Sequence, residues 1–171
     1  MKKTLYGFTM VELMVVVTII SILAGVMYVN FSDVRAESRD KVRQNTLLEM
    51  QVALELYKSQ YEVYPDQGCD TGSGWAGPGP SGCDEYIVGL APDFISALPR
   101  DLMWENEVGR GYRYQVNASR SAYKLLSYQA AEADLVDDYN HNFSRCPSNN
   151  CGVLPLEDTT YAVYSFGAEE W

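Results

Sequence analysis

The feature that most constrains this chain is an apolar run near its N-terminus. Residues 8–29 contain one charged side chain, that of Glu12, and Lys2 and Lys3 precede the run. As an α-helix rising about 1.5 Å per residue, the run would measure about 33 Å, enough to cross the hydrocarbon core of a bilayer. The two lysines predict that the N-terminus stays in the cytoplasm and that the chain after residue 29 lies on the other side.

Two commoner N-terminal signals agree less well with this run. A cleavable secretory signal has a shorter apolar core followed by a small-residue cleavage site, and no clean A-x-A site follows here. The segment Leu23-Ala24-Gly25 is like the start of a lipoprotein box, but Val26 stands where the lipidated cysteine must be. A plain single-pass anchor accounts for the length but not for Glu12, because a carboxylate inside an apolar helix is costly and usually has a function or a partner.

Beside the lysines the chain reads GFTMVE at residues 7–12, and the apolar stretch follows without a break. This motif resembles the class III signal of type IV pilins and type II secretion pseudopilins. In that family a membrane peptidase, the prepilin peptidase, cuts after the glycine and methylates the new N-terminal residue. The resemblance implies cleavage between Gly7 and Phe8, an N-methylated Phe8, and Glu12 as an assembly residue at the fifth position of the mature chain.

The chemistry of a cleaved N-terminus gives Glu12 two possible partners. Cleavage would create an ammonium group at Phe8, and in a low-dielectric setting it and the Glu12 carboxylate largely offset each other's desolvation cost. If the amine of an incoming subunit meets Glu12 of a subunit already in the filament, the pair fixes the axial register. The alternative is that Glu12 pairs with Phe8 of its own chain, one turn away, or extends to the membrane interface.

The resemblance also implies partners and a location. The implied partners are copies of the chain in a helical filament, the prepilin peptidase, membrane lipid before assembly, an inner-membrane platform and a cytoplasmic ATPase. The implied location is a single pass through the inner membrane with the head outside the cytoplasm, and then an extracellular pilus or a periplasmic pseudopilus. Neither pilus nor pseudopilus is favoured. Two alternatives also stay open: an adhesive minor pilin that binds a surface through the Trp75 loop or the C-terminal aromatic residues, and an anchored domain that does not polymerise.

A second pattern predicts that the helix continues into a folded domain. Residues 30–62 contain no Gly or Pro, so one helix is expected from about residue 8 to about residue 62. The charged stretch 32–44 is interpreted as a solvated neck. The next residues carry an apolar stripe with spacings of three and four, typical of a helix face packed on a small domain. The stripe consists of Leu47, Met50, Leu54, Tyr57 and Tyr61.

Alternating patterns predict a small antiparallel sheet in the C-terminal half. Residues 111–116 and 122–128 alternate apolar with polar side chains and are joined by a polar segment, which is typical of a β-hairpin. Residues 160–166 alternate in the same way. A sheet of three or four strands laid on the apolar stripe accounts for these patterns.

The predicted fold class is therefore α+β, pilin-like: a long N-terminal α-helix, half of it transmembrane, packed on a small antiparallel β-sheet head. We divide the chain into a leader peptide (residues 1–7), a transmembrane and filament-core helix (8–29), an amphipathic continuation of that helix (30–62) and a disulfide-bonded globular head (63–171).

Four cysteines lie in the part of the chain expected outside the cytoplasm: Cys69, Cys83, Cys146 and Cys151. An even number in an exported region predicts two disulfides, with three possible connectivities. We favour pairing of sequence neighbours, 69 with 83 and 146 with 151, because each pair encloses a loop rich in Gly, Pro, Ser or Asn. Zinc is the competing interpretation; it is disfavoured because the spacings are not those of paired CxxC motifs and only His141 could supply a nitrogen.

A weaker candidate is a calcium site near the C-terminus. An Asp-x-Asn-x-Asn sequence resembles the first half of an EF-hand loop, although Phe143 replaces the turn glycine and Asn149 the bidentate glutamate. Major pseudopilins bind calcium in a C-terminal loop, which the resemblance carries over as a possibility beside an acidic solvent loop. No other cofactor is predicted. The candidate ligands are Asp134, Asp137, Asp138, Asn140 and Asn142.

Charge and motif content argue against nucleic-acid binding and catalysis. The chain carries a net charge of -10, and removal of residues 1–7 would leave 11 basic and 23 acidic side chains, whereas non-specific nucleic-acid binding relies on Lys and Arg. A G-x-G-x-x-G match at residues 72–77 lies in a cysteine-flanked loop, where Pro78 blocks a following helix, so it does not indicate a nucleotide site. With one histidine and no Ser-His-Asp spacing, no enzyme is predicted.

Overall fold

The chain forms two compact units, Met1–Ala36 and Glu37–Trp171. The structure is a computed structural model that describes residues 7–69, 74–78, 83–101, 103, 110–136, 138–147 and 159–171, and the backbone alone of residues 26–30. One helix and three strands make up its regular elements in that part of the chain.

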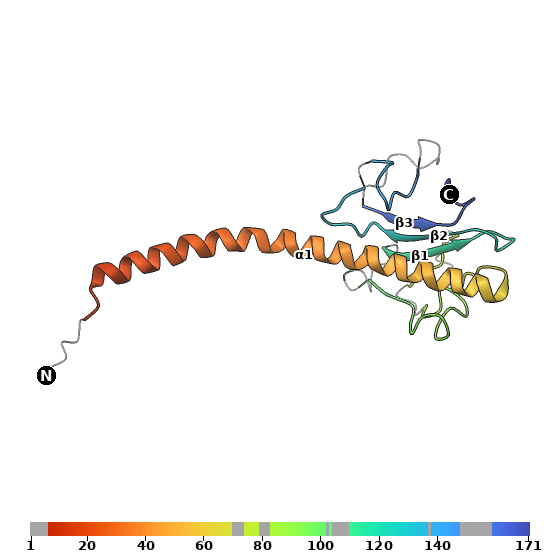
Figure 1. Ribbon diagram of the computed structural model, residues 1–171, viewed down its shortest axis with the longest axis horizontal. Coiled ribbons are helices and arrows are strands. Elements are labelled where there is room, and N and C mark those ends of the chain that lie inside the picture. Colours follow the sequence, from red (N-terminus) through yellow and green to blue (C-terminus); the bar gives the residue numbers. More distant parts are fainter. Residues whose placement is uncertain are drawn as a thin grey trace. The chain divides into compact units, whose positions relative to one another are not determined.

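The helix α1 covers Met10–Tyr61 (Figure 1). The predicted range, 8–62, is confirmed to within two residues at each end. The helix ends because Glu62 adopts a φ of 65°, the left-handed conformation that closes many helices, and Pro65 follows shortly after.

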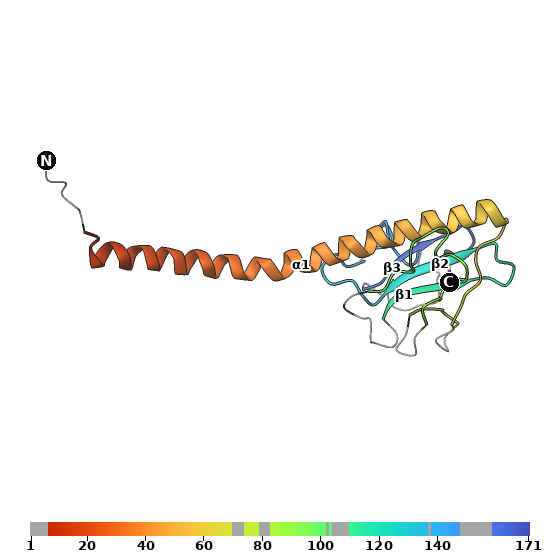
Figure 2. The ribbon, with the colours of Figure 1, turned by 90° about the horizontal axis from the view of Figure 1, so that it is seen from below.

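The strands β1 (Gly111–Val116), β2 (Tyr123–Tyr128) and β3 (Tyr161–Tyr164) form one antiparallel sheet in the order β1-β2-β3. Seen from below in Figure 2, the sheet lies along the part of α1 that belongs to the second unit. The predicted hairpin is confirmed, with β2 beginning one residue later than expected. The third strand is shorter than predicted, because the chain turns at Phe166 and Gly167.

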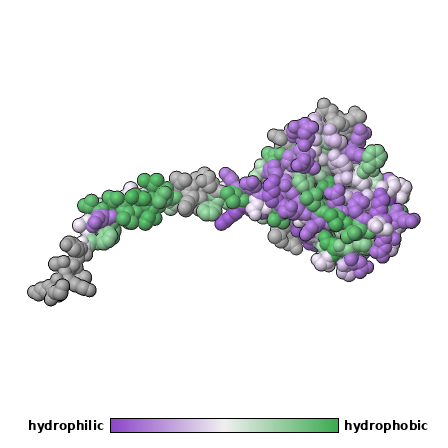
Figure 3. Space-filling model, in the orientation of Figure 1, coloured by the Kyte–Doolittle hydropathy of each residue, from purple (hydrophilic) through white to green (hydrophobic). Residues whose placement is uncertain are grey.

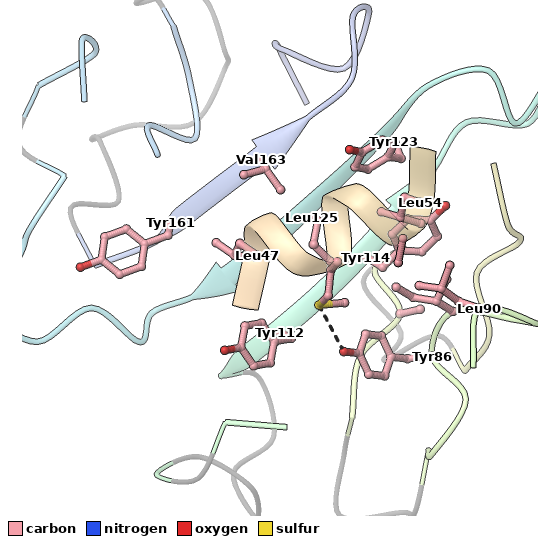
Figure 4. Close-up of a cluster of buried hydrophobic side chains, with 14 of the residues drawn as sticks. Leu47, Leu54, Tyr86, Leu90, Tyr112, Tyr114, Tyr123, Leu125, Tyr161 and Val163 are labelled. Atoms are coloured by element: carbon pink, nitrogen blue, oxygen red, sulfur yellow. Dashed lines mark hydrogen bonds between the residues drawn. The ribbon is translucent and has the colours of Figure 1, made fainter. Parts of the chain in front are cut away.

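The predicted apolar stripe forms the core between α1 and the sheet (Figure 4). Leu47, Met50 and Leu54 are fully buried, whereas Tyr57 is half-buried and Tyr61 is 48% exposed, so the packing weakens toward the end of the helix. The sheet meets this stripe with apolar side chains from all three strands. They are Tyr112, Tyr114, Tyr123, Leu125, Tyr161 and Val163.

Two of the buried tyrosines, Tyr86 and Tyr114, keep their hydroxyl groups paired, whereas the buried hydroxyl of Tyr123 has no partner among the described residues. Tyr86 donates to the Pro99 carbonyl at 2.9 Å and lies 3.9 Å from the Met50 sulfur, the contact dashed in Figure 4. Tyr114 donates to the Pro65 carbonyl at 2.8 Å. Large aromatic rings therefore fill a small core without leaving the first two of these hydroxyl groups unsatisfied.

The sheet is also covered on its second face, which the alternating pattern did not predict. Lys124 and Leu126 point away from α1, yet both are buried. The Lys124 ammonium donates to the carbonyl oxygens of Glu169 (3.0 Å) and Trp171 (2.9 Å), so the C-terminal residues fold back over this face.

The interpretation of residues 32–44 as a solvated neck is wrong for the second half of that stretch. Asp40, Arg43 and Gln44 are buried against the head. The Arg43 guanidinium donates to Asp101 (2.6 Å), Asp40 (2.9 Å) and Glu132 (2.7 Å). We call Asp40, Arg43, Asp101 and Glu132 the clasp.

Asp40 extends the clasp to the backbone of a loop more than 90 residues away. Its carboxylate accepts hydrogen bonds from the N–H groups of Glu132, Ala133 and Asp134, at 2.7 Å for Ala133 and 3.0 Å for Asp134. A row of backbone donors closing on one carboxylate stabilises the buried charge. The clasp therefore ties α1, Asp101 and the 132–134 loop together.

The clasp also shifts the pKa of two of its members, Arg43 and Glu132. Burial by itself lowers the pKa of Arg43, but hydrogen bonds to Asp101 and Glu132 outweigh it, and the pKa is raised. The hydrogen bond from Arg39, helped by Arg43, lowers the pKa of Glu132 to about 2 despite partial burial. Arg43 and Glu132 are therefore both charged at neutral pH.

Candidate processing and assembly site

The candidate site is the first turn of α1, which carries the GFTMVE motif. Thr9 is the N-cap: its carbonyl accepts the first helical hydrogen bond, from Leu13 at 3.3 Å, and its hydroxyl accepts the N–H of Glu12 at 3.2 Å. In return, the Glu12 carboxylate accepts the N–H of Thr9 at 2.9 Å. These reciprocal bonds are a capping box.

Sequence reasoning missed the role of Thr9, although the signal was present. The capping box has the pattern Ser/Thr-x-x-Glu/Gln at the start of a helix, and Thr9-Met10-Val11-Glu12 matches it. The motif by itself had suggested only the Phe8 amine as a partner of the Glu12 carboxylate. The structure shows that Thr9 already holds this carboxylate before any cleavage.

The capping box leaves the candidate cleavage position outside the helix. Gly7 and Phe8 precede the N-cap and have no regular secondary structure. Phe8 is 79% exposed, and a Cβ built on Gly7 meets no atom within 4 Å. The Gly7–Phe8 peptide bond is therefore accessible and free of helical hydrogen bonds, as a peptidase substrate must be.

Glu12 keeps acceptor capacity beyond the capping box. The two hydrogen bonds that its carboxylate accepts from Thr9, from the N–H (2.9 Å) and from the hydroxyl (2.8 Å), both fall on one oxygen, Oε2. An ionised carboxylate accepts about four hydrogen bonds over its two oxygens. A cation can therefore pair with Glu12 without displacing Thr9.

The helix after this site exposes apolar side chains on all its faces. Figure 3 shows hydrophobic residues gathered along this part of α1, in contrast to the mixed surface of the second unit. Over residues 10–25, whose side chains the structure describes, two hydroxyl groups interrupt the run, and each donates to the backbone of the preceding turn: Thr18 to the Met14 carbonyl and Ser21 to the Val17 carbonyl. The exposed apolar residues are Phe8, Met10, Val11, Leu13, Met14, Val15, Val16, Val17, Ile19, Ile20, Ile22 and Leu23.

Residues 6–28 match the prokaryotic N-terminal methylation motif. This match agrees with the resemblance of the segment to the class III signal of type IV pilins and pseudopilins. The methylation motif supports a membrane-anchored precursor of the type IV pilin or pseudopilin kind, and it is consistent with a structural subunit rather than an enzyme. Neither a curated protein nor a solved structure gives a significant match to the chain.

The membrane assignment of the methylation segment stays a prediction. Within the residues that the structure describes, no helix combines the length and the apolarity needed to cross a membrane. The side chains of residues 26–30, at the end of the predicted span, are not among those described.

The predicted disulfide between Cys69 and Cys83 is present, with an S–S distance of 2.11 Å across a separation of 14 residues. Cys146 is buried and disulfide-bonded. Its predicted partner, Cys151, lies outside the described residues, so that pairing stays a prediction.

Three of the candidate calcium ligands, Asp134, Asp138 and Asn140, are engaged with protein groups. Asp134 accepts hydrogen bonds from Lys41 (2.9 Å) and Gln44 (2.8 Å), and Asp138 accepts them from Asn140. Asn142 is exposed, and Asp137 lies outside the described residues. Over the described ranges, no three His, Cys, Asp or Glu side chains are grouped as a metal site requires, and calcium binding stays a prediction.

Proposed function

We propose that this chain is a structural subunit of a type IV filament, either a pilus or a type II secretion pseudopilus. The observation that carries the proposal is the start of α1, where the methylation motif, the capping box and the exposed Gly7–Phe8 bond coincide. In this proposal residues 1–7 are the leader, 8–29 the membrane and filament-core helix, 30–62 its continuation and 63–171 the head. A prepilin peptidase cuts after Gly7 and methylates Phe8.

The apolar surface of the first unit supports insertion followed by polymerisation. A helix that is apolar all round needs an apolar environment on every side. Lipid supplies it first and neighbouring copies of the same helix supply it later, an exchange that is nearly neutral in hydrophobic free energy. Because Thr18 and Ser21 satisfy their hydroxyl groups internally, neither environment leaves those groups unpaired.

Because the exchange is nearly neutral, specific polar contacts set the register of assembly. The amine created at Phe8 is the cation that the second oxygen of Glu12 can accept, on a neighbouring subunit in the filament. Extraction of the helix from the bilayer then requires work by other components, an inner-membrane platform and a cytoplasmic ATPase.

Intact mass and N-terminal sequencing of protein sheared from cells test the proposal. The expected chain starts at N-methylated Phe8 and is recovered in filaments. Recovery from surface filaments identifies a pilus, and recovery of the same chain only from the envelope identifies a pseudopilus. An unprocessed chain starting at Met1, in cells that have a prepilin peptidase, would contradict processing and leave an anchored domain.

Two variants separate processing from assembly. Gly7→Val places a β-branched side chain at the cleavage position and is expected to block processing, whereas Gly7→Ala, which stays small, is the matched control. Glu12→Gln is expected to be processed normally and to be lost from filaments, because the amide cannot pair with the Phe8 amine as a charge. Normal filaments from Glu12→Gln would overturn the register role.

A further inference from the structure

A recess on the second unit lies far from the methylation motif in sequence and is not needed for the proposed assembly. It is at the C-terminal end of β1 and has a volume of about 530 Å³, within the usual range for small-ligand sites. Gln115 pairs with Lys124 across the sheet, so the recess borders the sheet face that points away from α1. Its lining residues are Trp75, Gln115, Val116, Asn117, Arg145 and Trp171.

Two half-buried indole rings stand in this recess, those of Trp75 and Trp171. The Trp75 loop is fixed to the sheet, because Ala76 exchanges two backbone hydrogen bonds with Tyr114, at 2.8 and 2.7 Å. The face of an indole ring carries negative charge density, which favours the polarised C–H groups on the flat side of a sugar ring. Held in place before binding, such rings lose little conformational entropy when a ligand docks.

Gln115 provides a polar group in the same recess. Its carboxamide makes no hydrogen bond to any residue in the described part of the chain, although the side chain is half-buried. A carboxamide has both donors and acceptors, as sugar hydroxyl groups require. Asn117 has a different role, because its Oδ1 already accepts the N–H groups of Ser121 and Ala122 and so shapes the rim.

The recess also carries local positive charge, in a chain whose net charge is -10. The Arg145 guanidinium lies 5.8 Å from the Trp75 ring centre and 6.0 Å from that of Tyr128. Burial and then the charge of Arg145 together lower the pKa of Lys124 to about 7, against an opposing effect of Glu169, so Arg145 acts across this side of the sheet. The Arg113 guanidinium lies 4.3 Å from the centre of the Tyr128 ring, on the same face of the sheet but outside the lining of the recess.

We propose that this recess binds an acidic saccharide, with a sugar ring stacked on Trp75 or Trp171, hydroxyl groups bonded to Gln115 and a carboxylate facing Arg145. Aromatic rings and a carboxamide alone would suit neutral and acidic sugars equally. The Arg145 guanidinium favours acidic saccharides over neutral ones, because it can form charge-assisted hydrogen bonds to a carboxylate.

Isothermal titration of the full processed chain in detergent micelles tests this inference. The probes are trigalacturonic acid and its methyl ester, which has the same rings but no charge. Saturable binding of the acid, at least ten times tighter than that of the ester, is expected. Failure of the acid to bind, equal affinities, or tighter binding of a single-stranded oligonucleotide would overturn the proposal.

Three variants locate the site. Trp75→Ala and Gln115→Leu are each expected to weaken binding of the acid at least tenfold, and Arg145→Gln to abolish the preference over the ester. Phe166→Ala is the control, because Phe166 is an exposed aromatic residue outside the recess. Near-UV circular dichroism checks that each variant is folded; Gln115→Leu keeps the test decisive if Trp75→Ala unfolds. Unchanged affinity in folded Gln115→Leu and Arg145→Gln would overturn the site.

Discussion

Arg43 and Asp101 lie 58 residues apart in the chain, yet their side chains form a forked pair inside the second unit. The Nε of Arg43 donates to Oδ2 of Asp101 at 2.6 Å, and its Nη2 donates to Oδ1 at 3.2 Å. Both side chains are at most 4% exposed. A forked guanidinium–carboxylate pair fixes relative orientation as well as distance. It therefore sets how α1 meets the chain just before β1.

Replacing Arg43 by methionine is expected to reduce the free energy of unfolding of the second unit by about 3–5 kcal/mol, because Asp101 and Asp40 would stay buried without their cation. The measurement is urea unfolding of the full chain in detergent, followed by near-UV circular dichroism. Arg39→Met is the matched control: Arg39 bonds to Glu132 from the same helix but is 37% exposed, so a loss below about 1 kcal/mol is expected. Equal losses in the two variants would contradict a special role for the buried pair.

The free energy of unfolding of the second unit should fall at acid pH, because Glu132 becomes protonated and loses its ion pairs. Its pKa of about 2 lies below the ordinary 4.5, mainly because Arg39 and Arg43 bond to the ionised form. The stabilisation is therefore fully present above about pH 4.5 and is lost as the pH falls from there toward 2, by up to about 3 kcal/mol. The measurement is the difference in unfolding free energy between the wild type and Glu132→Gln at pH 7 and pH 3. A difference that does not shrink in acid would contradict the assignment.

The capping box predicts a role for Thr9 in assembly. Thr9→Val removes the hydroxyl that bonds to Glu12 and should weaken the helix start by about 1 kcal/mol, which corresponds to about a fivefold change in an equilibrium. The expected result is faster hydrogen exchange at the Leu13 amide and a lower fraction of processed chain in filaments. Thr9→Ser keeps the hydroxyl and serves as the control. Wild-type exchange in Thr9→Val would show that the cap does not hold this turn.

The disulfide between Cys69 and Cys83 should contribute about 3 kcal/mol to the stability of the second unit, because it closes a loop of about 14 residues in the unfolded chain. The double variant Cys69→Ser/Cys83→Ser is therefore expected to unfold at a lower urea concentration, with a slope no smaller than that of the wild type because its unfolded chain is less compact. A midpoint equal to that of the oxidised wild type would mean that the loop is ordered by other contacts.

Local patterns were sufficient for the regular elements and for the N-terminal signal. Spacings of three and four marked Leu47, Met50 and Leu54 as the packed face of α1, and alternation marked β1 and β2, because the helical and extended backbones present side chains with those periods. The GFTMVE motif determined the candidate processing site, since all its residues are adjacent in the chain. Even the capping box was readable, because it joins residues three apart.

Only the tertiary structure decided which polar residues are buried and what they contact. Asp40 and Arg43 stand among charged neighbours that are exposed, and nothing local separates them, because their partners Asp101 and Glu132 lie 58 and more residues away. The same holds for Lys124. The alternating pattern of its strand predicted a solvent-exposed side chain, but its ammonium bonds to the carbonyl oxygens of residues 169 and 171. The recess needs Trp75, Gln115 and Arg145 from three separate segments. Periodicity reports the face of an element, whereas burial of a charge depends on partners that only the folded chain brings within hydrogen-bonding distance.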